Sequence, residues 1–388
     1  MKRFRALDIA RGVAIAGTLG TNIWIFTMSM EASFLSLLSS TLTNGKFLGL
    51  LTIMFGIGMQ LKHDHLQKRG LPWYRIYIWA MVILFLDGLL HYIFVFEFDV
   101  LMSYAFVGIL ASFIITRPKK VIITVAILSL SLHLSNQFGW TNFPSVPYDM
   151  EDHDFIERTL TREEMNEQIR MEDAIAEGYV MFESDHTTYS EQVKDRLANF
   201  WMMRGEAVMI IPMNLALFLF GALLVQSGWV GFDERARRLQ KRLLLLSGTL
   251  GIPLLIATYW SDALVSYERY IIAPIVSCFY LSVVVYWART SIAPHIQRGF
   301  ENIGKMALTC YIGQNIISSI LFYNWGFGLA PLAKDWHTVV AWFGIVTFLM
   351  IFSTIWLRFF SRGPIELVWK KIESLAYPKQ PSPTISQN

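Results

Sequence analysis

The chain has 388 residues, of which 54% are hydrophobic and only 16% are charged, with a formal net charge of +3. Soluble domains average about 25% charged residues, so this composition indicates a membrane protein and excludes an ordinary soluble domain. The charge balance gives no reason to expect a nucleic-acid partner. Two cysteines, both within apolar segments, form neither a disulfide framework nor a metal-ligand spacing.

Ten segments of the chain approach the length of a membrane span, which needs about 20 mostly apolar residues. In chain order they lie near 9–28, 46–62, 75–95, 99–116, 120–138, 205–227, 243–261, 269–288, 306–325 and 337–357. Residues 31–45, between the first two, are expected to form an amphipathic stretch on the outer surface. The sequence therefore predicts an all-α fold, a polytopic transmembrane helical bundle of about ten spans.

The loops between these segments differ sharply in charge. Fifteen acidic and five basic residues lie between Trp140 and Asn199, where a helix is predicted from Thr161 to Ala176. Basic residues instead gather around Lys62–Arg69, Arg117–Lys120, Arg235–Arg242, Arg289–Arg298 and Arg358–Lys371. The positive-inside rule places the basic loops and both termini in the cytoplasm and the long acidic loop outside.

Four regions follow from this reading. Residues 1–138 form an amino-terminal membrane bundle of five spans, and residues 139–200 form the acidic extracytoplasmic loop. Residues 201–376 form a carboxy-terminal bundle of five spans, and residues 377–388 form a disordered tail.

Polar residues inside spans are costly and are therefore candidates for function. Asp8 and Arg11 are three residues apart at the start of the first span and can pair on one helix face. Asn22 lies on that face roughly 16 Å deeper. The alternative is an interfacial ion pair and a polar helix-packing contact.

A second candidate site surrounds a short connection centred near Val95. His91 lies four residues before this centre and Asp99 four residues after it, so the two side chains are expected to meet in a tight helical hairpin. A histidine oriented by a carboxylate can act as a general base. Asp87 lies one turn below His91. The alternative is a polar pair that only locks the hairpin.

Arg204 and Glu206 stand where the acidic loop re-enters the membrane, and an interfacial helix anchor is the simpler interpretation. No metal site is predicted, since His63 and His65 lack the spacing of a helical metal pair.

Several stretches of the chain carry a resemblance to a known family. They are LDIARGVAIAGTLGTNI (7–23), GKFLGLLTIMFGIGMQ (45–60), GLLHYIFVFEFDVLMSYAFVG (88–108), LFGALLVQSGW (219–229), NIGKMALTCYIGQNIISSILFYNWGFGL (302–329) and WLRFFSRGPIELVW (356–369). On these motifs the chain resembles the YeiB-like family of bacterial inner-membrane proteins, a domain of unknown function. The family pattern covers Asp8, Arg11, Gly12, Asn22, His91, Asp99, Tyr104, Gly108, Gly304, Met306, Ala307, Leu308, Thr309, Tyr311, Gln314, Gly363, Pro364, Glu366 and Trp369.

The chain departs from that pattern at Tyr92, where the family usually has a small residue, and in its longer, more charged acidic loop. Its first span is also similar to that of integral-membrane acyltransferases, which carry acyl groups across the membrane onto sugars or glycans. One branch of that superfamily has its presumed base, a histidine, eleven residues after the equivalent of Arg11. Asn22 stands there in this chain and cannot serve as a base, so the resemblance implies a shared fold more firmly than a shared reaction.

The first functional hypothesis is a membrane-embedded acyltransferase of the bacterial inner membrane. Acyl-CoA is the candidate donor, entering near Arg11, and no tightly bound cofactor is expected. His91, oriented by Asp99, would deprotonate an acceptor hydroxyl on a small molecule or glycan, and Asn22 would stabilise the oxyanion. Asp8, Tyr104, Gln314, Arg204 and Glu206 complete the predicted substrate- and donor-binding set.

Two alternatives stay open. A transporter of a small polar solute would use the same polar residues as a path, with helices broken at Pro212, Pro253 and Pro274. A non-catalytic scaffold would use the acidic loop, with ten net negative charges, to bind a basic partner or divalent cations. The lipid bilayer is a partner in every case, and the sequence does not set the oligomeric state.

Overall fold

A computed structural model describes residues 5–27, 33–140 and 188–378. The helix predicted from Thr161 to Ala176 and the predicted tail beyond residue 378 lie outside these ranges. Every regular element within them is helical. The predicted all-α fold is therefore confirmed.

Within the described residues, seven helices are long and apolar enough to cross a membrane, counting the adjoining α2 and α3 as one. They are α1 (Arg5–Thr27), α2 (Phe34–Thr43) with α3 (Lys46–Lys68), α4 (Trp73–Phe94), α6 (Lys119–Gln137), α12 (Glu234–Ala257), α14 (Ala273–Trp287) with the π-helical turn η4 (Glu268–Ile272), and α17 (Asp335–Phe359). An eighth candidate is the pair formed by η2 (Met202–Arg204) with α10 (Gly205–Met209) and α11 (Ile211–Gln226), bent by 42°.

Two further apolar helices, α5 (Leu101–Ile114) and α16 (Ala307–Phe322), are shorter. Each of the ten predicted spans therefore coincides with an apolar helix. The count of ten membrane crossings and the cytoplasmic position of the termini stay predictions.

In the described part of the chain, four helices of ten or more residues lie outside these apolar segments or at their ends. The stretch predicted to be amphipathic contains α2, whose amino terminus is capped by the Ser33 side chain. The others are α9 (Tyr189–Ala198), α15 (Pro294–Lys305) and α18 (Pro364–Glu373). The sequence reading treated α15 and α18 as parts of basic loops. It missed the amphipathic periodicity and the proline in the first turn, which favour a short helix lying along a surface.

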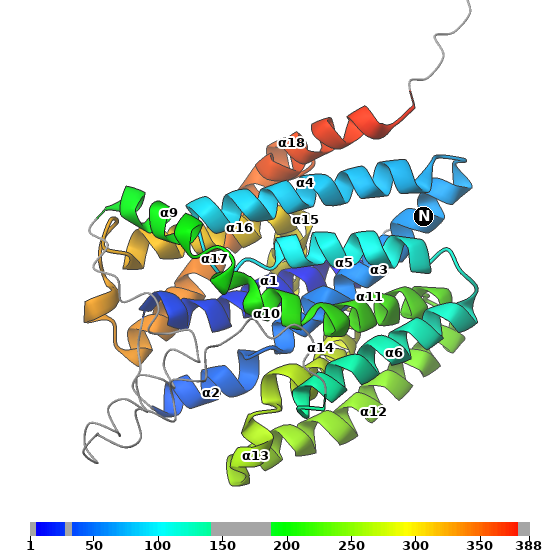
Figure 1. Cartoon of the computed structure of the whole chain (residues 1–388), viewed down its shortest axis with the longest axis horizontal. Helices are drawn as coiled ribbons and strands as arrows, with labels where there is room; N and C mark the ends of the chain where they lie inside the picture. Colours follow the sequence, from blue (N-terminus) through cyan, green and yellow to red (C-terminus); the bar gives the residue numbers. More distant parts are fainter. Residues whose placement is uncertain (1–4, 28–32, 141–187, 379–388) are drawn as a thin grey trace, which may run out of the picture.

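The helices run roughly side by side, with α1 through the middle of the bundle (Figure 1). The amino terminus and the α3–α4 connection lie at one end, and α2 and α9 lie at the other (Figure 1). Helices of the two predicted bundles contact one another: α1 packs on α15 and α16, and α3 packs on α11 and α14. The first helix is therefore enclosed by elements from the carboxy-terminal half.

The contact between α1 and α15 is made backbone to backbone at two glycines. A Cβ atom on Gly12 would overlap the carbonyl group of Phe300, and one on Gly304 would overlap that of Asp8. Small residues allow such approach where helices gain no hydrophobic driving force from association. Because α16 follows directly after α15, this crossing fixes the start of α16 beside α1.

Candidate functional site

The predicted contact between His91 and Asp99 is present. His91 lies in the last turn of α4, and Asp99 lies in the turn that precedes α5. The imidazole Nδ1 is 3.0 Å from Asp99 Oδ1, and both side chains are buried. Asp99 Oδ2 also accepts a hydrogen bond from the backbone N–H of Met102, 3.1 Å away. One carboxylate thus caps the first turn of α5 and holds the histidine.

The closeness of this hairpin depends on Gly88, one turn before His91. A Cβ atom at this position would stand 2.7 Å from both Asp99 Oδ2 and the Met102 nitrogen. Any larger residue would therefore push the carboxylate away from its place.

Asn315 is a third member of the site and was missed by the sequence reading. Its Nδ2 lies 3.1 Å from His91 Nε2, and its buried Oδ1 has no hydrogen-bond partner among the described residues. An amide that donates to Nε2 and a carboxylate that accepts from Nδ1–H together fit a neutral imidazole with its proton on Nδ1. The sequence feature that could have indicated Asn315 is its position next to Gln314, because two polar residues inside an apolar segment are candidates for function.

Gln314 of α16 and Asn22 of α1 lie where these two helices meet near the site. Gln314 Nε2 lies 3.5 Å from Thr18 Oγ1, and its buried Oε1 has no partner within the described chain. Asn22 follows Thr18 by one turn on the same helix face, is half-buried, and makes no hydrogen bond to a described residue. The structure does not bond Asn22 to His91; the amide of Asn315 occupies that position.

Arg204 joins the site through the backbone of the hairpin turn. Its guanidinium donates to the carbonyl oxygen of Asp99 at 3.0 Å and to that of Glu97. It also lies over the ring of Tyr92, 4.2 Å from the ring centroid. Tyr92 directs its hydroxyl to the carbonyl oxygen of Arg196 at 2.6 Å. Arg204 therefore holds the backbone of the turn between α4 and α5 in place.

A buried ion pair, which the sequence reading did not predict, closes the same end. Arg196 of α9 lies 2.8 Å from Glu97 Oε2, and the Tyr323 hydroxyl donates to Glu97 Oε1 at 3.0 Å. Burial acts to lower the pKa of Arg196, but the adjacent Glu97 carboxylate outweighs it, and the net effect is a raised pKa. We call the trio of Glu97, Arg196 and Tyr323 the outer clamp, since it ties α9 and α16 to the hairpin.

A groove of ≈ 310 Å³ runs along the seam between α4 and α16 beneath α9. Ile316, Ser319 and Ile320 line it from α16, and Phe94 and Val95 line it from the end of α4. Ser319 Oγ donates to the Val95 carbonyl oxygen at 3.0 Å across the seam. Ser319 Oγ also lies 2.8 Å from the carbonyl oxygen of Asn315, so the groove passes within one helix turn of the amide that contacts His91.

The remaining predicted residues lie elsewhere. Arg11 approaches Asp8 Oδ1 at 3.5 Å and the Gly304 carbonyl oxygen at 3.4 Å. Glu206 pairs with Arg269 at 2.7 Å and accepts from the Tyr270 hydroxyl at 3.0 Å. The Tyr104 hydroxyl contacts Thr52 Oγ1 at 2.7 Å and the Leu48 carbonyl oxygen at 3.1 Å, on α3.

The first of these, the pair of Asp8 and Arg11, lies far from His91. Phe26 of α1 stacks on Phe96 of the hairpin turn with ring centroids 4.6 Å apart. Arg11 precedes Phe26 by 15 residues, which is about 22 Å of helix. The two polar pairs therefore occupy opposite ends of the bundle. Across the described residues, no cluster of three or more potential metal ligands occurs.

Apolar helices of spanning length, with buried polar groups joined between them, define the class: a multi-span helical membrane protein. Comparison with known proteins shows which sequences within this class the chain resembles. Residues 224–376 match the family described as "Protein of unknown function (DUF418)". The chain is therefore similar to the YeiB-like family.

Two similar proteins match over nearly their whole length. "Uncharacterized protein YxaH" of Bacillus subtilis (strain 168) is 26% identical over 404 residues, covering 97% of this chain and 95% of that protein. "Uncharacterized protein YeiB" of Escherichia coli (strain K12) is 23% identical over 420 residues, covering 96% of each. No solved structure is a significant match.

Proposed function

We propose that the protein is an acyltransferase embedded in the bacterial inner membrane, with His91 as its general base. The observation that supports this most is the line formed by Asp99, His91 and Asn315. Its hydrogen bonds, 3.0 Å at Nδ1 and 3.1 Å at Nε2, direct the lone pair of Nε2 toward a polar group. This is the tautomer that a general base requires.

The proposed reaction moves one acyl group and one proton. His91 Nε2 takes the proton of an acceptor hydroxyl on a small molecule or glycan while the hydroxyl oxygen attacks the carbonyl carbon of an acyl thioester such as acyl-CoA. The C–S bond breaks, an ester forms, and the imidazolium returns the proton to the leaving thiolate. Asp99 stabilises the transient imidazolium, and the amides of Asn315 and Asn22 would donate to the carbonyl oxygen.

Access to His91 would come along the α4–α16 groove. An acceptor hydroxyl would displace the Asn315 amide from Nε2, because that amide is held there by the single contact with the histidine. The donor would bind at the other end, where Arg11 is suited to a phosphate or carboxylate. Since Arg11 lies about 22 Å of helix away, this proposal requires the acyl group to cross most of the bundle.

The test compares ester-linked acyl groups on envelope glycans and secreted metabolites by mass spectrometry. Strains would carry the wild-type protein, His91→Ala, Asp99→Asn or His133→Ala as a matched control. His133 is buried, and its hydrogen bond within the described chain is to the Tyr270 carbonyl oxygen. We expect loss of a specific ester in the first two variants, with normal membrane insertion, and no change in the control. An active His91→Ala protein would end the proposal.

A transporter is the second candidate, and one observation favours it. Asp87, one turn from His91, has a buried carboxylate whose neighbour in the described chain is the Trp369 indole, and a buried carboxylate of this kind could take up a proton or cation. The bend at Ile210 before Pro212 and the π-helical turn before Pro274 provide broken helices. Reconstituted vesicles separate the two readings: solute flux without a new ester supports transport, whereas an ester supports transfer.

A further inference from the structure

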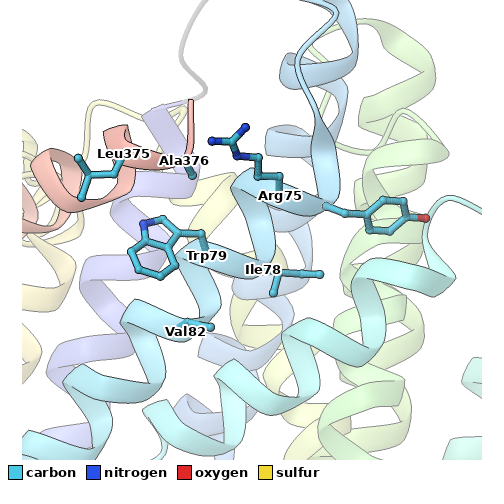
Figure 2. Close-up of a pocket in the computed structure, with 7 residues that line it drawn as sticks. Arg75, Ile78, Trp79, Val82, Leu375 and Ala376 are labelled. Atoms are coloured by element: carbon cyan, nitrogen blue, oxygen red, sulfur yellow. The ribbon is translucent and has the colours of Figure 1, made fainter. Parts of the chain in front are cut away.

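A groove at the basic end of the bundle combines an exposed arginine with an apolar floor. It has a volume of ≈ 580 Å³. Arg75, Ile78, Trp79 and Val82 line it at intervals of three and four residues, so they form one stripe along α4. Figure 2 shows Arg75 at the upper end of this stripe, with Trp79, Ile78 and Val82 below it.

The Arg75 guanidinium has no partner among the described residues. Arg75 is exposed and makes no hydrogen bond or ion pair with any residue that the structure describes. The acid next to the groove, Glu373, already pairs with Lys62. The rim therefore carries a positive charge that the described part of the protein does not neutralise.

The other wall of the groove belongs to an element with an exposed apolar face. Leu375 and Ala376 of η6 (Ser374–Ala376) stand beside Arg75 (Figure 2). Leu375 is 71% exposed, and Val368 and Ile372 of α18 are 61% and 37% exposed on the same side. Lys370 and Lys371 lie in the last turn of α18. An amphipathic helix of this kind lies in a bilayer interface with its apolar face in the acyl region.

Trp79 fixes this helix to α4. Its Nε1–H donates to the Ile372 carbonyl oxygen at 3.0 Å. The groove is thus a recess between two elements with exposed apolar side chains, and it runs from Arg75 to Val82. These two residues are seven apart, which is about 10 Å of helix and comparable to the depth at which an interfacial helix buries its apolar face.

We infer that this groove binds one anionic phospholipid. Arg75 would hold the phosphate, and the first segment of an acyl chain would lie on Ile78, Trp79 and Val82 against Leu375. Guanidinium–phosphate hydrogen bonding and burial of the chain supply the recognition. The site is independent of the histidine site and of the proposed reaction.

The experiment uses full-length protein, stripped of lipid in detergent, and measures bound lipid by native mass spectrometry. The probes are phosphatidylglycerol, phosphatidylcholine of the same chain length, and glycerol 3-phosphate as a headgroup without chains. We expect phosphatidylglycerol to bind about five- to tenfold more tightly than phosphatidylcholine, and Arg75→Gln to remove this preference. Glycerol 3-phosphate should not compete at equal concentration, since it lacks the chain.

Arg117→Gln is the matched control, because Arg117 is also exposed at the end of an apolar helix at the basic end but lies outside the groove. Val82→Trp tests the floor and should weaken binding of both lipids. Thermal unfolding should stay unchanged in Arg75→Gln, since the side chain makes no described contact. Equal affinity for the two lipids, or equal losses in Arg75→Gln and Arg117→Gln, would overturn the inference.

Discussion

The outer clamp offers a quantitative test of how the hairpin is held. We consider Arg196→Met, Glu97→Gln and the double variant. Arg196→Met removes the charge and keeps an apolar stem. Glu97→Gln removes the opposite charge but keeps an oxygen that can accept from Tyr323.

The structure sets the expected magnitude. Arg196 and Glu97 are each 1% exposed, so either charge left alone would be buried without compensation. Breaking a buried pair in this way costs about 3–5 kcal/mol of unfolding free energy. We expect each single variant to lose unfolding free energy at the lower end of this range, about 3 kcal/mol, which is roughly a 150-fold shift in the folding equilibrium. The loss stays low because the hydrogen bond from Tyr323 to residue 97 survives. The double variant should lose less than the sum of the singles by at least about 1.5 kcal/mol.

The measurement is unfolding by sodium dodecyl sulfate titration in mixed micelles, followed by tryptophan fluorescence. The same cycle at Arg5 and Glu301 is the control. That pair lies 2.5 Å apart, but Arg5 is largely exposed, so its coupling should stay below about 1 kcal/mol. If the clamp singles add to within about 0.5 kcal/mol, the pair does not act as a unit and the reasoning is wrong.

Three further changes test packing and capping by the same titration. Gly88→Ala should destabilise by about 1–3 kcal/mol through its clash with Asp99, whereas Gly58→Ala, where a Cβ meets nothing within 4 Å, should be neutral or slightly stabilising. Gly304→Leu should separate α15 from α1 and lower the yield of folded protein, while Gly344→Leu, also in open space, should not. Glu366→Ala should cost about 1–3 kcal/mol, since its carboxylate accepts hydrogen bonds from both backbone and side chain at the start of α16.

The hairpin could be predicted from the sequence because its information is local. Apolar runs on each side of Val95 mark where α4 ends and α5 begins, and the equal spacing of His91 and Asp99 from that point places both at one level. The cap that Asp99 gives to Met102 is a local interaction of the same kind. Such features need only helix geometry and a short connection.

Asn315 and Arg196 could not be predicted in this way. Asn315 is 224 residues from His91, and its register against α4 follows from helix contacts made elsewhere, including the crossing of α1 and α15 at Gly12 and Gly304. Arg196 is one of five basic residues in the acidic loop, and nothing in their order indicates which of them pairs with Glu97. Both contacts join distant segments, and a single sequence carries no record of such pairing.

The position of the two polar pairs constrains any mechanism for this fold. Arg11 and His91 lie at opposite ends, so a reaction or a transport step that used both would have to carry its cargo along α1. Thr18, Gln314 and Asn22 lie between them, and the buried oxygen of Gln314 is without a partner among described residues. A cargo moving along this route would meet Thr18 and Asn22 of α1 and Gln314 of α16 before it reached Asn315 and His91. Gln314→Leu would remove a polar side chain between Arg11 and His91 without altering either of them. If the route is continuous, this variant should lose activity; if the two polar pairs are structural and unrelated, it should not.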